Sequence, residues 1–225
     1  YRNEGKEFFS DVAADNGVAQ ETRLLSGWGL KFFDYDNDGL LDLILANGHP
    51  DDMIENYSQQ VRYKEPLVLF HHEGKRLTNV SAQAGPVFQK QFPARGLAIG
   101  DYNNDGRLDV LIGNNGDAPV LLKNHAGAGN HWLGVKLQGT TCNRDAIGAT
   151  LTWSAGDWKR SRYKASGGSY LSSHDMREVL GLGTATKLNW LEIKWPAPSA
   201  RVERLTDLPI DRYVTIVEGK GKIEA

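Results

Sequence analysis

The sequence of 225 residues has little of several features that identify common classes of protein. Its single cysteine, Cys142, can form neither an intramolecular disulfide nor a thiolate metal site. The longest apolar runs, such as residues 43–46, are far shorter than the ~18 residues that a membrane-spanning helix needs. The net charge of −2 is not the marked basic excess of a general nucleic-acid binder. We therefore expect a protein without a membrane span that packing or bound ions stabilise.

Long amphipathic helices are also missing, and short strands take their place. Residues 54–62 could form two helical turns, but most apolar residues alternate with polar ones, as in residues 149–153 and 191–195. The 25 glycines lie between these runs, which indicates many tight turns. The pattern predicts an all-β protein.

The charge is distributed unevenly along the chain. Residues 1–129 contain 12 Lys and Arg against 18 Asp and Glu, whereas residues 130–225 contain 14 against 10. The acidic part ends in the glycine-rich stretch 126–129, after which the sequence becomes basic and rich in Trp. This shift predicts a first domain over residues 1–129 and a second over residues 130–225.

The predicted first domain contains an internal repeat of about 67 residues. Residues 29–43 align without gaps on residues 96–110, and residues 1–6 align on residues 70–75. Residues 121–124 resemble the start of a third unit. We therefore expect repeated β units in this part of the chain.

Each repeat carries an aspartate-rich loop of the pattern D-x-[DN]-x-D-G-x-x-D, here named the first loop (residues 34–42) and the second loop (residues 101–109). Oxygen side chains at positions 1, 3, 5 and 9 can wrap a hard cation such as Ca²⁺, and glycine at position 6 permits the sharp turn. A backbone carbonyl at position 7 adds a further ligand. The predicted ligands of two Ca²⁺ sites are Asp34, Asp36, Asp38, Leu40, Asp42, Asp101, Asn103, Asp105, Arg107 and Asp109.

The loops differ from EF-hands, because position 12 holds Leu45 or Ile112 in place of a bidentate Glu. An alternative interpretation is a pair of hairpin turns without an ion, since Asp, Asn and Gly are common turn residues. Carboxylates crowded into nine residues repel one another unless a cation neutralises them, which favours the metal sites. The first loop has four carboxylates and the second has three, so we expect tighter binding at the first.

These loops and their flanks, residues 1–6 and 96–114, resemble FG-GAP/VCBS repeats, the blade units of integrin-like β-propellers. The second half resembles the ASPIC/UnbV domain in residues 143–149, 166–173, 181–183 and 191–196. The combination is similar to the cartilage acidic protein family and its bacterial relatives. The resemblance implies propeller-type blades followed by a small β-sandwich-like domain, calcium ligation by the side chains of both loops, and a secreted, extracellular or periplasmic location.

A propeller needs about four or more blades to close, and only two aspartate loops are visible. We therefore expect an incomplete propeller whose blades are completed by a longer chain or by a protein partner. The stretch 47–66 is longer than its counterpart after residue 114, which predicts a loop insertion that could carry a contact surface.

A basic stripe is expected in the second half, because Arg160, Arg162 and Lys164 would share one face of a strand. The stripe could bind an acidic glycan or nucleic acid, pack against the acidic repeats of its own chain, or form a solvated strand face. These three interpretations stay open on the sequence alone.

No catalytic residues are predicted. Ser172, His174 and Asp175 are close in sequence, but catalytic triads are assembled from distant segments, and the sequence has no G-x-S-x-G motif. We expect a non-enzymatic, calcium-stabilised extracellular binding or assembly module that mediates protein contacts. A carbohydrate-binding module and an accessory subunit of a larger complex or enzyme are the alternatives.

Overall fold

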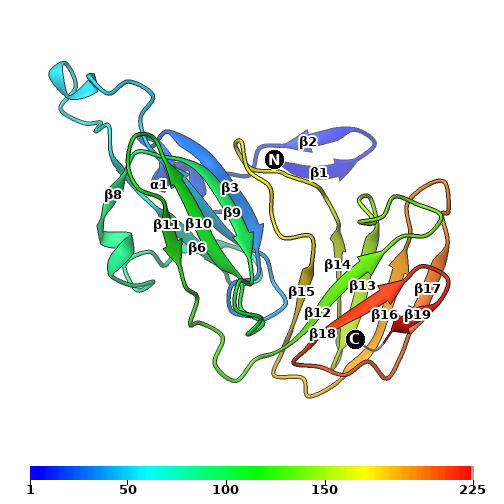
Figure 1. The fold of residues 1–225 in the computed structure, drawn as a ribbon. Helices are drawn as coiled ribbons and strands as arrows, with labels where there is room; N and C mark the ends of the chain where they lie inside the picture. The colour runs from blue at the N-terminus through cyan, green and yellow to red at the C-terminus, as the bar shows by residue number, and fades with distance from the viewer. Residues whose placement is uncertain (224–225) are drawn as a thin grey trace.

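The computed structural model describes residues 1–223, and most of its regular structure is β-strand (Figure 1). This confirms the predicted all-β class. The helical elements in this part of the chain are short, and they are α1 (Val18–Thr22) and the 3-10 turns η1 (Ile54–Asn56) and η2 (Pro86–Gln89). None of the described helices is long and apolar enough to cross a membrane.

The strands before residue 130 lie on the left and at the top of Figure 1. They are β1 (Arg2–Gly5), β2 (Phe8–Ser10), β3 (Gly27–Phe33), β4 (Asp42–Asn47), β5 (Glu65–Pro66), β6 (Val68–His72), β7 (Leu77–Asn79), β8 (Gln91–Phe92), β9 (Ala94–Gly100), β10 (Asp109–Asn114) and β11 (Val120–Leu122). They form a four-stranded sheet of order β3-β4-β6-β7, a three-stranded sheet of order β11-β10-β9, and the pairs β1-β2 and β5-β8. Within residues 1–223 these sheets close no barrel.

The internal repeat of the sequence is also a repeat of structure. β3 pairs with β4 and β9 pairs with β10, and an aspartate loop connects the two strands of each pair. The registers are equivalent, since Phe33 faces Asp42 and Gly100 faces Asp109. β6 and β11 then add as third strands in the two sheets. The short match at residues 121–124 therefore reflects a shared third strand.

The strands from residue 131 onward form two further sheets, on the right of Figure 1. They are β12 (His131–Gln138), β13 (Thr150–Ala155), β14 (Trp158–Tyr163), β15 (Glu178–Gly183), β16 (Leu188–Lys194), β17 (Val202–Leu205), β18 (Tyr213–Val217) and β19 (Gly221–Ile223). The sheet orders are β15-β12-β18-β19 and β14-β13-β16-β17, with β12 and β18 parallel. No sheet of the described chain contains strands from both sides of residue 130.

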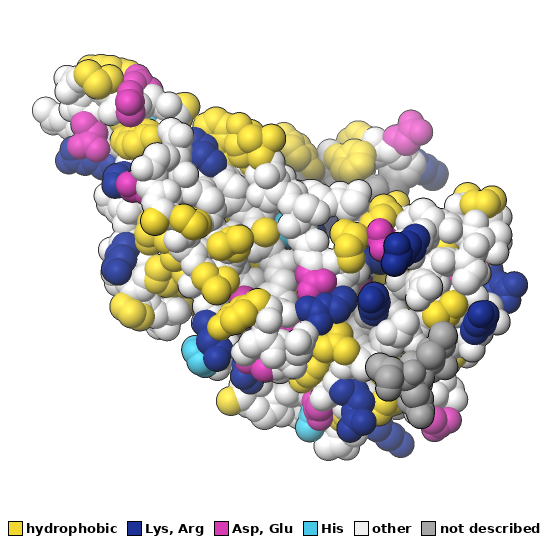
Figure 2. All heavy atoms as spheres, viewed as in Figure 1, with side chains coloured by type: hydrophobic (Ala, Val, Ile, Leu, Met, Phe, Trp, Pro, Cys, Tyr) yellow, Lys and Arg dark blue, Asp and Glu magenta, His cyan; other side chains and the backbone are white. Residues whose placement is uncertain are grey.

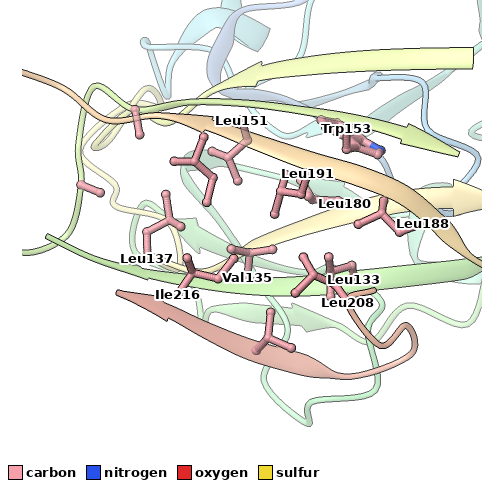
Figure 3. Close-up of a cluster of buried hydrophobic side chains, with 14 of the residues drawn as sticks. Leu133, Val135, Leu137, Leu151, Trp153, Leu180, Leu188, Leu191, Leu208 and Ile216 are labelled. Atoms are coloured by element: carbon pink, nitrogen blue, oxygen red, sulfur yellow. The ribbon is translucent and has the colours of Figure 1, made fainter. Parts of the chain in front are cut away.

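The core between these two sheets follows the predicted alternation of apolar and polar residues. On β13, Leu151 and Trp153 are buried, whereas Thr150 and Thr152, which alternate with them, are half-buried. Figure 3 shows side chains from both sheets, such as Val135 and Leu191, pointing into the space between them. A fully buried Leu, Ile or Val side chain contributes roughly 1.5–3 kcal/mol, so this core holds the two sheets together.

The predicted helical turns over residues 54–62 are wrong beyond the first turn. η1 ends at Asn56, and Ser58 Oγ then accepts hydrogen bonds from the backbone N–H groups of Gln60 and Val61. A serine hydroxyl that bonds nearby amides offers the backbone an alternative to a helix. The segment therefore continues as a projecting loop, which is the cyan extension at the upper left of Figure 1.

Candidate metal centre

The first loop connects β3 to β4 and makes the sharp turn that its sequence predicts. Gly39, at position 6, has a φ of 87° in the left-handed region that favours glycine. Asn37 also has a positive φ, and asparagine tolerates this region better than most residues. The turn folds the carboxylates of the loop back toward one another.

Three of these carboxylates converge. Asp34, Asp36 and Asp42 each offer an oxygen that lies within 4.8 Å of the others, and Asp34 and Asp42 are 0% exposed. Asp34 Oδ2 accepts a hydrogen bond from the backbone N–H of Gly39 at 2.9 Å, but the buried Asp34 Oδ1 has no hydrogen-bond partner in the described structure. A buried carboxylate oxygen without a donor is costly, and a cation bound beside this atom would remove that cost.

Burial raises the affinity of two of these carboxylates for protons. Burial raises the pKa of Asp34 to about 7, although the positive charge of Arg162 acts in the opposite direction. Burial also raises the pKa of Asp42 to about 6, against the hydrogen bonds that it accepts from the backbone of His72 and Tyr35. A positive charge nearby would stabilise the ionised form of both carboxyl groups.

The remaining carboxylate of the first loop, Asp38, is less deeply buried than Asp34 and Asp42. Asp38 is half-buried, and its Oδ1 accepts a hydrogen bond from the backbone N–H of Leu40 at 2.6 Å. Asp36 and Asp38 also form a second acidic group with His71, which comes from β6. The first loop therefore has one buried group of carboxylates and one more exposed group beside it.

His71 is the member of this centre that sequence reasoning missed. Its Nδ1 lies 3.0 Å from Asp42 Oδ1 and 3.8 Å from Asp36 Oδ2. The alignment of residues 1–6 on residues 70–75 places Arg2 opposite His71, but Arg2 pairs with Glu4 in the structure. The sequence therefore carries no signal that links His71 to the acidic loop.

The second loop connects β9 to β10, and its oxygens already have donors. Asp101 accepts hydrogen bonds from the backbone of Asp105 and Gly106 and from the Tyr213 hydroxyl. Asp105 Oδ2 accepts from Asn103 Nδ2 at 2.9 Å and from the Arg107 guanidinium at 2.7 Å.

Asp109 is buried, and its two oxygens accept backbone N–H groups of Tyr102 and Asn124. Position 9 of the first loop, Asp42, accepts the equivalent amides of Tyr35 and His72. In the described chain, the groups of three or more acidic or His side chains close enough to share an ion involve the first loop alone. The donor set and the unpartnered oxygen therefore fit a hard cation better at the first loop than at the second.

The first loop is enclosed by the second half of the chain. The backbone N–H of Gly183 donates to Asn37 O at 2.8 Å, and Asn130 Nδ2 donates to Asp36 O at 2.8 Å. A side chain at Gly181 would meet Asp34, since an added Cβ would lie 2.0 Å from Asp34 Oδ2. The candidate centre therefore lies where the two halves meet.

Family models match both parts of the chain. An FG-GAP-like repeat matches residues 34–112, and the ASPIC and UnbV model matches residues 139–223. The chain joins an FG-GAP-like repeat to an ASPIC/UnbV domain. This confirms the predicted combination of families. No curated protein matches the chain.

The FG-GAP-like match begins at the first residue of the first loop and includes both loops. Each match lies within one of the two predicted domains, while the boundary between residues 129 and 130 stays a prediction. The final residues 224 and 225 of the predicted second domain lie outside the described structure.

The basic stripe of the ASPIC/UnbV domain faces the rest of the chain. Arg160 Nε donates to Gly39 O at 3.0 Å, and Arg162 donates to Val179 O at 2.7 Å. Lys164 is 1% exposed, and its ammonium group donates to Met176 O. A ligand in solution cannot reach Lys164 in this arrangement, whereas the two arginines line a cleft beside the first loop.

Ser172, His174 and Asp175 are engaged with the FG-GAP-like repeat and with Arg177. Ser172 Oγ accepts the backbone N–H of Leu97, and His174 Nδ1 accepts that of Ile99. Asp175 forms an ion pair with Arg177 at 2.6 Å. The contacts of Ser172 and His174 attach the ASPIC/UnbV domain to β9.

Proposed function

We propose that the protein is a non-enzymatic binding or assembly module in which Ca²⁺ at the first loop stabilises the junction of its two halves. The observation that carries this proposal is the buried, unpartnered Asp34 Oδ1 beside Asp36 and Asp42. Oxygen donors alone, arranged in a tight loop, are the set that Ca²⁺ prefers in proteins. The residues that would hold it are Asp34, Asp36, Asp38, Leu40 through its carbonyl, and Asp42.

The role of the ion would be structural. A bound Ca²⁺ supplies positive charge to a buried group of carboxylates, and it stabilises the folded state by about RT ln(1 + [Ca²⁺]/Kd). Weak loop sites need millimolar calcium, which favours a secreted, extracellular or periplasmic setting. The second loop is proposed as a weaker site, because Arg107 and Tyr213 already donate to its carboxylates.

Protein contacts are proposed for the FG-GAP-like repeat, either with a partner or with further blades of a longer chain. An apolar cleft of about 740 Å³ lies between its two sheets and is lined by side chains such as Phe33, Leu69 and Leu122. Figure 2 shows hydrophobic side chains gathered over this half of the molecule. Leu111 and Leu121 are 47% and 53% exposed, and apolar side chains gathered at a surface often mark an interaction site.

Calorimetric titration with Ca²⁺ of the chain and of two variants tests the metal proposal. Asp36→Asn removes a half-buried charge from the first loop, and Asp105→Asn removes the matching half-buried charge from the second loop. We expect Asp36→Asn to weaken the tighter binding event at least tenfold, because one of the three converging carboxylates is lost. Asp105→Asn should leave that event within about twofold.

Thermal melting gives the second readout. A chelator should lower the melting temperature of the wild-type chain and of Asp105→Asn more than that of Asp36→Asn. The metal proposal is wrong if Ca²⁺ produces no heat in the wild-type chain and the chelator leaves its melting temperature unchanged.

A further inference from the structure

A cleft of about 370 Å³ lies between the two halves of the protein. Its walls come from the end of the first loop, from the turn between β6 and β7, and from β14. None of its lining residues is Asp or Glu. Its cationic lining residues are Lys75, Arg76, Arg160 and Arg162. A cleft lined by charge of one sign concentrates ligands of the opposite sign.

Three of these cations have no carboxylate partner. Within residues 1–223, Lys75, Arg76 and Arg160 form no ion pair closer than 4.0 Å. Arg162 is the exception, since it lies 3.7 Å from Glu178. The positive charge of the cleft therefore remains available to a ligand.

The two arginines are held in place before any ligand binds. Arg160 donates to Gly39 O and lies 4.9 Å from the ring centre of Trp158. Arg162 donates to Val179 O and lies 5.6 Å from the ring centre of Trp153. A guanidinium that is already positioned loses little freedom on binding an oxyanion, and its planar fork matches carboxylate and sulfate groups.

An aromatic ring lies beside these cations. Phe32, which lines the cleft from β3, is 49% exposed and offers a flat apolar surface. The backbone amides of Gly39 and Leu40 already donate to Asp34 and Asp38, so recognition here depends on side chains. Cations around an apolar face suit a ligand that carries anionic groups on a ring.

We propose that this cleft binds a short acidic glycan whose sugar rings lie against Phe32 and whose carboxylate or sulfate groups contact the cations. The inference deepens the proposed binding function by assigning a ligand class to one site. The volume of the cleft lies within the range of small-ligand sites, roughly 300–1,000 Å³. An acidic peptide shares the charge but not the ring, and the test includes it as a competing ligand.

The first loop links this cleft to the proposed calcium site. Gly39 and Leu40 form part of the wall, and Arg160 is hydrogen-bonded to Gly39. A cation that fixes the loop also fixes this wall and one of the arginines. We expect removal of Ca²⁺ to weaken glycan binding through this contact.

The test is calorimetric titration of the full chain in millimolar Ca²⁺ with four probes of equal length. They are a heparin-derived tetrasaccharide, a tetragalacturonate, the neutral maltotetraose, and tetraglutamate. We expect the acidic glycans to bind, with an affinity that falls as the NaCl concentration rises, and the neutral glycan to bind at least tenfold more weakly. Sulfated and carboxylated probes together show which oxyanion is preferred.

Two double variants locate the binding. Lys75→Gln with Arg76→Gln changes exposed cations of the cleft, and Lys90→Gln with Lys194→Gln changes exposed cations outside it. The cleft variant should lose about tenfold in affinity for the acidic glycan, whereas the control should stay within about twofold. Phe32→Ala should weaken the acidic glycan and leave tetraglutamate unchanged, which separates ring stacking from charge.

The inference is overturned if neutral and acidic glycans bind equally, if both double variants lose the same affinity, or if tetraglutamate binds more tightly than either acidic glycan. Calcium heats recorded on the same samples keep the two proposals apart. If the wild-type chain binds calcium but no glycan, this inference alone is contradicted. If the wild-type chain does not bind calcium, the proposed function is contradicted.

Discussion

Gly181 shows at residue scale how closely the two halves fit around the first loop. It lies within β15, and an added Cβ would lie 2.0 Å from Asp34 Oδ2 and 2.8 Å from the backbone of Asn37. We expect Gly181→Ala to lower the free energy of unfolding by about 1–3 kcal/mol, because the loop or the strand must move. Urea unfolding measures this loss.

The matched control for this change is Gly113→Ala on β10. An added Cβ there has its nearest neighbour at 3.8 Å, which is ordinary van der Waals contact. We expect Gly113→Ala to leave stability within about 0.5 kcal/mol. Equal losses in the two variants would contradict the close fit at Gly181.

We expect His174 to make the stability of the protein depend on pH. Burial lowers the pKa of His174 to about 4, and the nearby charge of Lys31 on β3 acts in the same direction. Its Nδ1 accepts the backbone N–H of Ile99, so the neutral ring is the form that the fold binds. Because the folded pKa lies below the unfolded value of about 6.5, the contribution of the neutral His174 ring to stability is fully present above pH 6.5. This contribution is lost as the pH falls toward 4.

The variant His174→Asn keeps an acceptor for the Ile99 amide and removes the titration. Urea unfolding between pH 7 and pH 4 should show a smaller loss of stability in His174→Asn than in the wild-type chain. Parallel curves for the two proteins would show that His174 does not titrate over this range.

At the scale of elements, the segment 172–175 holds β9 from the side opposite β10. Ser172 Oγ and His174 Nδ1 accept the N–H groups of Leu97 and Ile99, and the Asp175 N–H donates to Ile99 O. Side chains thus satisfy amides that a neighbouring strand would otherwise bond. The ASPIC/UnbV domain therefore covers β9, the edge strand of the sheet β11-β10-β9.

Hydrogen exchange can detect this arrangement. In Ser172→Ala, the Leu97 amide loses its acceptor, and we expect its exchange rate to rise about fivefold to tenfold. The Ile99 amide, which is bonded to His174, should change by less than about twofold and serves as the internal control. An unchanged Leu97 rate would contradict the role assigned to Ser172.

The elements that could be predicted from the sequence are those that local patterns determine. The alternation around Leu151 gives β13, and the aspartate spacing gives the turn at Gly39, because both depend on neighbours along the chain. The approach of His71 to Asp42 depends on β6 lying beside β4, which the loop pattern does not contain. The pairing of Asp105 with Arg107 depends on the direction of a side chain.

The basic stripe illustrates the same limit. Its shared face was predicted correctly for Arg160 and Arg162 on β14, but the surroundings of that face come from residues far along the chain. Lys164 is buried because its ammonium group reaches Met176 O in the segment before β15. Lys75 and Arg76 join the two arginines only because the halves are placed together in the fold.

At the scale of the whole molecule, the acidity of the first half has a local origin. The two loops hold seven of its 18 acidic residues, and the first loop lies at the contact between the halves. Asn37 Nδ2 also donates to Gly106 O, so the two loops touch each other as well as the ASPIC/UnbV domain. Charge that would repel at a free surface is placed where a cation would join several parts of the chain.

This placement predicts that Ca²⁺ at the first loop stabilises both halves together. Five of the six tryptophans, Trp132, Trp153, Trp158, Trp190 and Trp195, lie after residue 130, where no calcium ligand is proposed. If the halves unfold as one unit, the urea midpoint of tryptophan fluorescence should rise with Ca²⁺. Each tenfold increase above the Kd should add about 1.4 kcal/mol.

Asp36→Asn should remove most of this rise, whereas Asp105→Asn should retain it. A calcium-dependent midpoint in far-ultraviolet circular dichroism with a fixed midpoint in tryptophan fluorescence would show that the halves unfold separately. The contact of Gly183 with Asn37 would then contribute too little to couple them. A shared shift of both midpoints would instead mean that Ca²⁺ bound at the first loop also stabilises the two sheets after residue 130, whose own residues do not touch the ion.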